Sequence, residues 1–152
     1  MPNIHIRIPK GSYPGAARAD LVRRINDAAA NAEQIPAEPR KRMLCWVLID
    51  EVAHGAWTCG GTDITTQLLP CVATVYVPAG VLNDTARAQY VQELHEAFKQ
   101  SSAAEDAHQV ASSVVLHEVT DGFWGVNGSI WRLPQFVNAA GFAHLQHLAH
   151  GY

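Results

Sequence analysis

This sequence of 152 residues has a small net charge, few cysteines and no long apolar run. Lysine and arginine number 11 against 14 aspartates and glutamates, so the formal net charge is −3. This balance gives no electrostatic reason to expect nucleic acid or an anionic membrane as a partner. No stretch approaches the roughly 18 consecutive apolar residues that would suggest a membrane span. The alternating residues at the start also lack the continuous apolar run of a signal peptide.

The three cysteines, Cys45, Cys59 and Cys71, are an odd number without the spacing of a disulfide framework or a metal site. They fit the reduced cytoplasm better than a secreted protein. A chain of this length can bury a core without a disulfide or a metal. We therefore expect one cytoplasmic domain over residues 1–152, with no metal and no cofactor.

Residue patterns in the first half predict a strand, a helix and a second strand. Isoleucines alternating with polar residues predict a strand over Pro2–Ile8. After a loop rich in proline and glycine, apolar residues three and four apart predict a helix over Ala16–Glu33. The run Met43–Val52, rich in Leu, Val, Ile and Trp, predicts a buried strand.

The second half predicts the same order of elements. A strand is expected over residues 71–77, followed by an N-cap at Asp84 and a helix over Thr85–Gln100. A further strand is expected over Val110–Val119. An offset of 69 maps Pro2 onto Cys71, and the pattern E-V-x-x-G-x-W occurs at both Glu51 and Glu118. The chain is therefore a fused duplication, with one repeat over about 2–64 and another over about 71–130.

Such repeats predict an α+β fold, in which two β-α-β units form a four-stranded sheet with two helices on one face. The uncovered sheet face would need a neighbour if it is apolar, so we expect oligomers. The tail, residues 131–152, is apolar in a way that suits packing on a neighbouring subunit.

Several motifs in this order resemble the tautomerase superfamily, which includes 4-oxalocrotonate tautomerase, cis-3-chloroacrylic acid dehalogenase and macrophage migration inhibitory factor. The resemblance covers about residues 2–130 and is carried by Met1-Pro2 opening a strand, Ile4-His5-Ile6, Gly11, the repeated E-V-x-x-G-x-W, and the glycine-bearing hairpins that follow Trp57 and Trp124. It implies a homotrimer in which the amino-terminal proline lies at the base of an apolar pocket. Only one such proline can exist per chain, because Pro70-Cys71 opens the second repeat within the chain.

The resemblance implies that Pro2 is the catalytic residue once Met1 is removed, which is normal before a small residue. A free proline is a secondary amine, and burial in an apolar pocket lowers its pKa towards neutrality. Such an amine can move a proton between carbon atoms beside a carbonyl. We therefore expect keto–enol tautomerisation of a small carboxylate, oxo-acid or enol. Hydratase, dehalogenase or decarboxylase chemistry is the alternative, as is a non-catalytic trimer that binds a ligand or protein.

The substrate-binding residues are less completely matched. Members of the family usually hold the substrate carboxylate with arginines. The first matching position here is Ser12, or Tyr13 if the loop is shifted, and the second is about Trp46, or Ser113 in the second repeat. Trp57 and Trp124 match an aromatic residue near the pocket, although packing in the core explains them equally well. The candidates for a replacement cation are Arg7, Lys10, Arg40, Arg42 and Arg132, of which Arg132 is favoured because it lies in an apolar tail.

Two further groups are weaker candidates. We expect Cys59 and Cys71 near the pocket, but no base accompanies them as a nucleophile would require. His144, His147 and His150 recur every third residue, and the first two could share a metal ion on a helix. Without a carboxylate or cysteine beside them, a solvent-facing stripe or an oligomer contact is the better interpretation.

Overall fold

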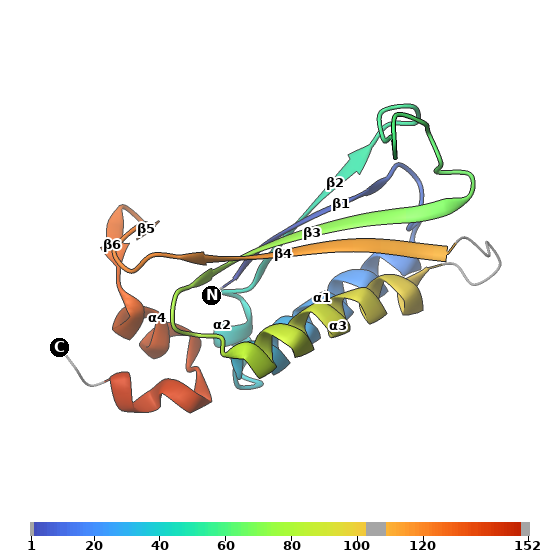
Figure 1. Cartoon of the computed structure of the whole chain (residues 1–152). Helices are drawn as coiled ribbons and strands as arrows, with labels where there is room; N and C mark the ends of the chain where they lie inside the picture. The colour runs from blue at the N-terminus through green and yellow to red at the C-terminus, as the bar shows by residue number, and fades with distance from the viewer. Residues whose placement is uncertain (1, 103–108, 150–152) are drawn as a thin grey trace.

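A four-stranded mixed sheet with two long helices on one of its faces forms the body of the protein in this computed structural model (Figure 1). The structure describes residues 2–102 and 109–149. The strands are β1 (Asn3–Pro9), β2 (Trp46–Val52), β3 (Leu68–Pro78) and β4 (Gln109–Val119), arranged in the order β2-β1-β3-β4. The pairs β1–β2 and β3–β4 are parallel, whereas β1 and β3 are antiparallel. This topology confirms the fused pair of β-α-β units.

The two long helices are α1 (Ala16–Glu33) and α3 (Asp84–Ser101), which pack side by side across the sheet. Alternation along β1 turns Ile4, Ile6 and Ile8 towards these helices, and all three are fully buried. The predicted bounds of α1 agree with the structure. The predicted cap of α3 is wrong by one residue, because the side chain of Asn83 accepts the hydrogen bond from Ala86 N at 2.8 Å.

A short helix, α2 (Pro39–Arg42), was not expected from the sequence. It ends directly before the strand predicted over Met43–Val52. The observed strand begins only at Trp46. Proline suits the first turn of a helix, since its missing N–H would have no helical partner there. The apolar residues after this helix gave no signal for where the strand should start.

The second repeat is followed by a hairpin of β5 (Trp124–Val126) and β6 (Ser129–Trp131), then by α4 (Leu133–Ala140) and the 3-10 helix η1 (Ala143–Leu148). The tail was expected to pack on a neighbour, but this prediction is wrong for its main apolar residues. Phe136, Val137, Ala140 and Phe142 are buried in their own chain. Ala143 N also donates to the carbonyl of Gln34 at 2.9 Å, which ties the tail to the end of α1.

The antiparallel pairing of the two repeats gives the sheet two distinct ends. We call the amino-terminal end the one where β1 and β2 begin and β3 and β4 finish, and the other the opposite end. The last turn of α1, the short α2 and the helices of the tail all lie near the amino-terminal end (Figure 1). No helix in the described part of the chain is long and apolar enough to cross a membrane.

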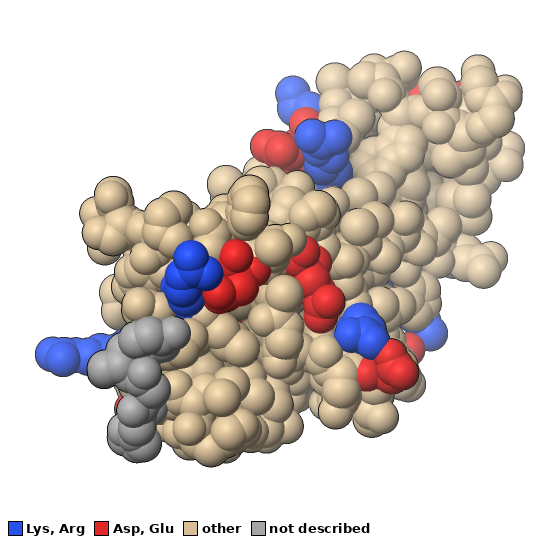
Figure 2. Space-filling model, turned by 60° about the vertical axis from the view of Figure 1, so that its left-hand side comes forward, with Lys and Arg blue, Asp and Glu red and all other residues tan. Residues whose placement is uncertain are grey.

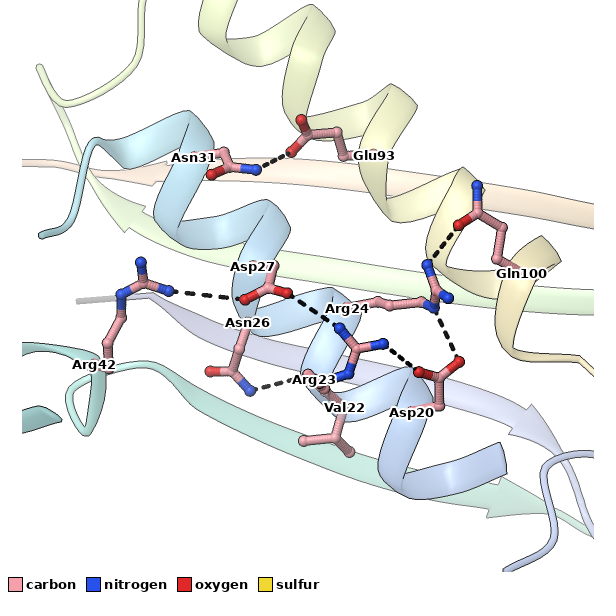
Figure 3. A network of polar contacts seen from close by, with 10 residues as sticks. All are labelled: Asp20, Val22, Arg23, Arg24, Asn26, Asp27, Asn31, Arg42, Glu93 and Gln100. Carbon is pink, nitrogen blue, oxygen red and sulfur yellow. Dashed lines mark hydrogen bonds and ion pairs between the residues drawn. The ribbon is translucent and has the colours of Figure 1, made fainter. Parts of the chain in front are cut away.

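Charged side chains on the surface lie mostly beside partners of opposite sign (Figure 2). On the outer side of the two long helices, Asp20 binds both Arg23 and Arg24, and Arg24 reaches Gln100 of α3 (Figure 3). Exposed ion pairs of this kind contribute only about 0–1 kcal/mol each. Burial of the apolar layer between sheet and helices therefore contributes most of the stabilisation.

Candidate functional site

Pro2 lies directly before β1, the second strand in the order of the sheet, and is buried. Its carbonyl accepts a hydrogen bond from Trp46 N at 3.0 Å, so it is held at the start of the β1–β2 pair. Alternation along the strand gives Pro2 the same side of the sheet as Ile4, which is the side covered by the helices. The structure thus places the predicted catalytic residue inside the protein, at the amino-terminal end of the sheet.

Glu33, the last residue of α1, is a fully buried carboxyl group at the same end. The hydroxyl of Tyr90, on α3, donates a hydrogen bond to Glu33 Oε2 at 2.8 Å. Burial raises the pKa of Glu33, while the positive charge of the amino terminus and the Tyr90 hydrogen bond act in the opposite direction. Burial, together with the neighbouring Glu33, also raises the pKa of Tyr90.

Cys45 completes this group. It comes directly before Trp46, which pairs with Asn3 in the parallel ladder, so it lies alongside Pro2. Burial first, and then the negative charge of Glu33, raise the pKa of Cys45 to about 12. A thiol with that pKa is protonated at neutral pH and is a poor nucleophile. We refer to Pro2, Glu33, Cys45 and Tyr90 as the amino-terminal cluster.

Arg42 is the predicted cation whose charge acts on this cluster, because it lowers the pKa of Cys45 against the larger effect of burial. Its Nε donates to the carbonyl of Pro36 at 3.1 Å, and its Nη1 lies 3.9 Å from Asp27 Oδ1 (Figure 3). About a third of its side chain is exposed. A carboxylate could therefore reach this guanidinium from solvent.

The other four candidate cations lie in different parts of the structure. Arg132 forms an ion pair with Asp121 at 2.9 Å and is exposed at the start of α4. Arg7 is on the sheet face away from the helices, 3.9 Å from Asp50, and Arg40 is exposed. Lys10 lines a cavity at the opposite end of the sheet.

The two predicted tryptophans do not come together within one chain. Trp124, in β5, packs on Phe136 with ring centroids 5.2 Å apart. It also lines a groove of about 310 Å³ at the amino-terminal end, on the sheet face away from the helices. The other lining residues are Asn3, His5, Tyr76, Val119, Phe123 and Gly125. Trp57 follows β2 and lies at the opposite end.

A second cavity, of about 260 Å³, lies at the opposite end. Its lining residues are Pro9, Lys10, Gly11, Ser12, His54, Thr65, Thr66, Leu68, Leu69 and Ser102. The buried Cys71 is near this end of β3, and its sulfur lies 3.6 Å from the hydroxyl of Tyr13. Cys59 is exposed in the loop after β2. Neither cysteine is near Pro2, so the expected position of these two is wrong for the single chain.

The described residues contain no group of three or more His, Cys, Asp or Glu arranged to hold a metal ion. His144 is in a 3-10 helix, and its Nε2 lies 2.7 Å from the carbonyl oxygen of Val81. His147 is exposed, and His150 is outside the described residues. The His144 contact gives one of the three histidines a role in attaching the tail to the domain.

These features define a class of protein: a fused pair of β-α-β units whose first strand lies within the sheet and follows a buried Pro2. Among solved structures, this is the fold of the fused tautomerases, and the present chain has that fold. It is similar to a fused 4-OT solved as a symmetric trimer, with 20% identity and a TM-score of 0.66, over 84% of this chain and 94% of that chain.

Two further similarities support the same fold. Pt0534, solved after inactivation by 2-oxo-3-pentynoate, has 16% identity and a TM-score of 0.67 over 84% of this chain and 94% of that chain. Macrophage migration inhibitory factor of Toxoplasma gondii has 12% identity and a TM-score of 0.61, over 85% of this chain and 99% of that chain. No protein-family model and no curated protein matches the sequence.

Glu33, Tyr90 and Cys45 were not expected as site residues from the sequence. One signal was present, since Glu33 follows Ala29 by four residues and so continues the apolar stripe of α1. A carboxylate on the buried side of a helix is rare unless it has partners. The partner Tyr90 looked like a core residue, because its apolar ring fits the stripe of α3 equally well.

Proposed function

We propose that the protein belongs to the tautomerase superfamily and acts on a small oxo-acid or enol, with Pro2 as general acid/base after removal of Met1. The single observation that carries this proposal is the burial of Pro2 at the end of the sheet where the carboxyl group of Glu33 is also buried. An amine in such surroundings has a pKa set by the protein, and proton transfer is most efficient when that pKa is near the working pH. The fold supports the assignment independently, since fused tautomerases share it.

Arg42 is the cation that we assign to the substrate carboxylate. It is partly exposed, and its charge already acts on the amino-terminal cluster. Arg132 and Trp124 lie near the same end of the sheet and could contribute from the hairpin side. Trp57 could reach the site only from a neighbouring subunit, because it lies at the opposite end of its own sheet.

We propose a homotrimer that is formed through the sheet face away from the helices. This face exposes the apolar side chains of Trp46, Leu48 and Val115, each about half accessible in the single chain. Covering them removes apolar surface from water, which favours association. Similar structures are described as trimers. Sedimentation equilibrium should give three times the chain mass, and a stable monomer would contradict this assembly.

Covalent labelling at the amino terminus tests the catalytic proposal. Pt0534 is inactivated by 2-oxo-3-pentynoate, and we expect the same reagent to modify the amino-terminal peptide here. Intact mass first establishes whether Met1 is absent. Peptide mapping then locates the adduct, and rates with phenylenolpyruvate and 2-hydroxymuconate are compared between the wild type and Pro2→Ala.

The matched control keeps the fold and blocks the amine. A chain carrying a short uncleaved extension before Pro2 has an amide at that nitrogen, so it should take up no label and show no turnover. Retained Met1 in the wild type, or equal rates for Pro2→Ala, would contradict the proline mechanism. A trimer without turnover would then favour the non-catalytic binding function.

A further inference from the structure

A carboxyl group buried at the end of α1 distinguishes the first repeat from the second. The offset of 69 residues that relates the buried positions of the helices, such as Leu21 and Tyr90, places Ser102 where the first repeat has Glu33. The same offset places Cys71 where the first repeat has Pro2. The carboxyl group therefore occurs in the repeat that begins with the chain's amino terminus, and is replaced in the repeat that cannot have a free amine.

The geometry brings this carboxyl group to Pro2. Helix α1 starts near the end of β1 and runs back beneath the sheet, so that its last turn lies at the amino-terminal end (Figure 1). Pro2 faces the helix layer there, and Cys45 beside it is within electrostatic reach of Glu33. A fully buried carboxylate is costly unless it is paired and hydrogen-bonded. Tyr90 supplies one hydrogen bond at 2.8 Å, and the positive charge of the amino terminus lowers the pKa of Glu33 against the larger effect of burial.

We propose that Glu33, held by Tyr90, is the counter-group of the Pro2 amine, and that the two groups share one proton and titrate as a unit. The proposal rests on the proposed function in requiring a free Pro2, and it makes Glu33 a positioning residue that sets the protonation state of the catalytic amine. Coupled groups of this kind lose their protons in two steps that belong to the pair. The last proton is held more tightly than an isolated buried amine would hold it.

Titratable groups face Glu33 from several elements. From α3 Tyr90 donates a hydrogen bond to Glu33, and from the turn before β2 the protonated Cys45 lies close by. Arg42, on α2, acts on Cys45 and is screened by its exposure. In the tail, α4 has no titratable side chain and His144 of η1 contacts the carbonyl of Val81. Glu33 is thus the nearby acid that can exchange a proton with the amine in the described part of the chain.

The test is a pH titration of the Pro2 nitrogen by NMR in protein labelled with 15N-proline. Pro2 is distinguishable among the eight prolines because it alone would have an amine. In Glu33→Gln, the amine loses its counter-group and its proton affinity should fall at least about tenfold, a pKa drop of about one unit. Glu38→Gln is the matched control, since Glu38 is near α2 but exposed and paired with Lys41. It should leave the titration unchanged.

Tyr90→Phe gives a second test, in which the pKa of the Pro2 amine should change in the opposite direction. It removes a hydrogen bond that stabilises the ionised carboxylate, so the pair should hold its last proton more tightly and the amine pKa should rise. Equal titrations in Glu33→Gln and Glu38→Gln would overturn the proposal, as would a fall in Tyr90→Phe. If Glu33→Gln does not fold, the Tyr90→Phe result decides.

Failure of this proposal is distinguishable from failure of the proposed function. If turnover depends on Pro2 but the Pro2 titration is the same in Glu33→Gln as in the wild type, the enzyme assignment is supported and the pairing is contradicted. A titration that responds to both variants, in a protein without turnover on either substrate, supports the pairing and contradicts the assignment. When both hold, the pH at half-maximal kcat/KM should follow the amine pKa in each variant.

Discussion

The tail should be part of the folded domain, and replacement of Phe142 tests this directly. Phe142 is fully buried and immediately precedes the residue whose amide bonds the end of α1. Phe142→Ala removes a buried ring and leaves a cavity, which in protein cores costs about 3–5 kcal/mol. Because small domains are stable by only about 5–15 kcal/mol, this single change should remove a large part of the free energy of unfolding.

Phe123→Ala is the matched control, since Phe123 is 78% exposed and its loss should change the free energy of unfolding by less than about 0.5 kcal/mol. Urea unfolding is followed by far-UV circular dichroism, with the midpoint and slope fitted separately. Each variant is measured at two protein concentrations, because assembly adds a concentration-dependent term. Equal stability of the two variants would show that the tail does not pack on its own chain.

Two other predictions concern the surface. Asp121→Ala should destabilise the protein by about 0.5–2 kcal/mol through loss of the cap on Leu133 N, whereas Arg132→Ala should cost less than about 1 kcal/mol. The Leu133 hydrogen bond and then Arg132 lower the pKa of Asp121. The advantage of the wild type over Asp121→Ala should therefore be full above the ordinary pKa of 3.8 and disappear as the pH falls through the lowered value in acid titrations of stability. Finally, one thiol of three should react rapidly with a disulfide reagent at pH 8. Cys59 is exposed, whereas burial and a raised pKa protect the other two cysteines. A fast phase that persists in Cys59→Ser would contradict this.

Periodicity and repetition in the sequence were sufficient to predict the sheet, the two long helices and the duplication. The isoleucines of β1 alternate without interruption, and α1 begins and ends where its stripe predicts. The short α2 was missed because a single turn is too short to show a period. The packing of Phe136 and Phe142 was also misjudged, since an apolar stripe shows that a surface is buried but not which chain covers it.

The candidate site was harder to predict for a different physical reason. Pro2 could be proposed from its position, but the other cluster residues come from the end of α1, from within α3 and from the turn before β2. Glu33 and Tyr90 are 57 residues apart and meet only because α1 and α3 pack side by side. Trp57 and Trp124 occupy matching places in the two repeats, and the antiparallel pairing of β1 with β3 sends such places to opposite ends of the sheet. Their similarity in sequence therefore predicted separation within the chain.

The position of β1 between β2 and β3 has a practical consequence for anyone who prepares this protein. A purification tag placed before Pro2 would be joined to the domain at a buried residue, directly before a strand that has a neighbour on each side. The tag would also turn the Pro2 nitrogen into an amide. We recommend tag-free material, or a protease that leaves proline as the first residue, as the starting point for every measurement.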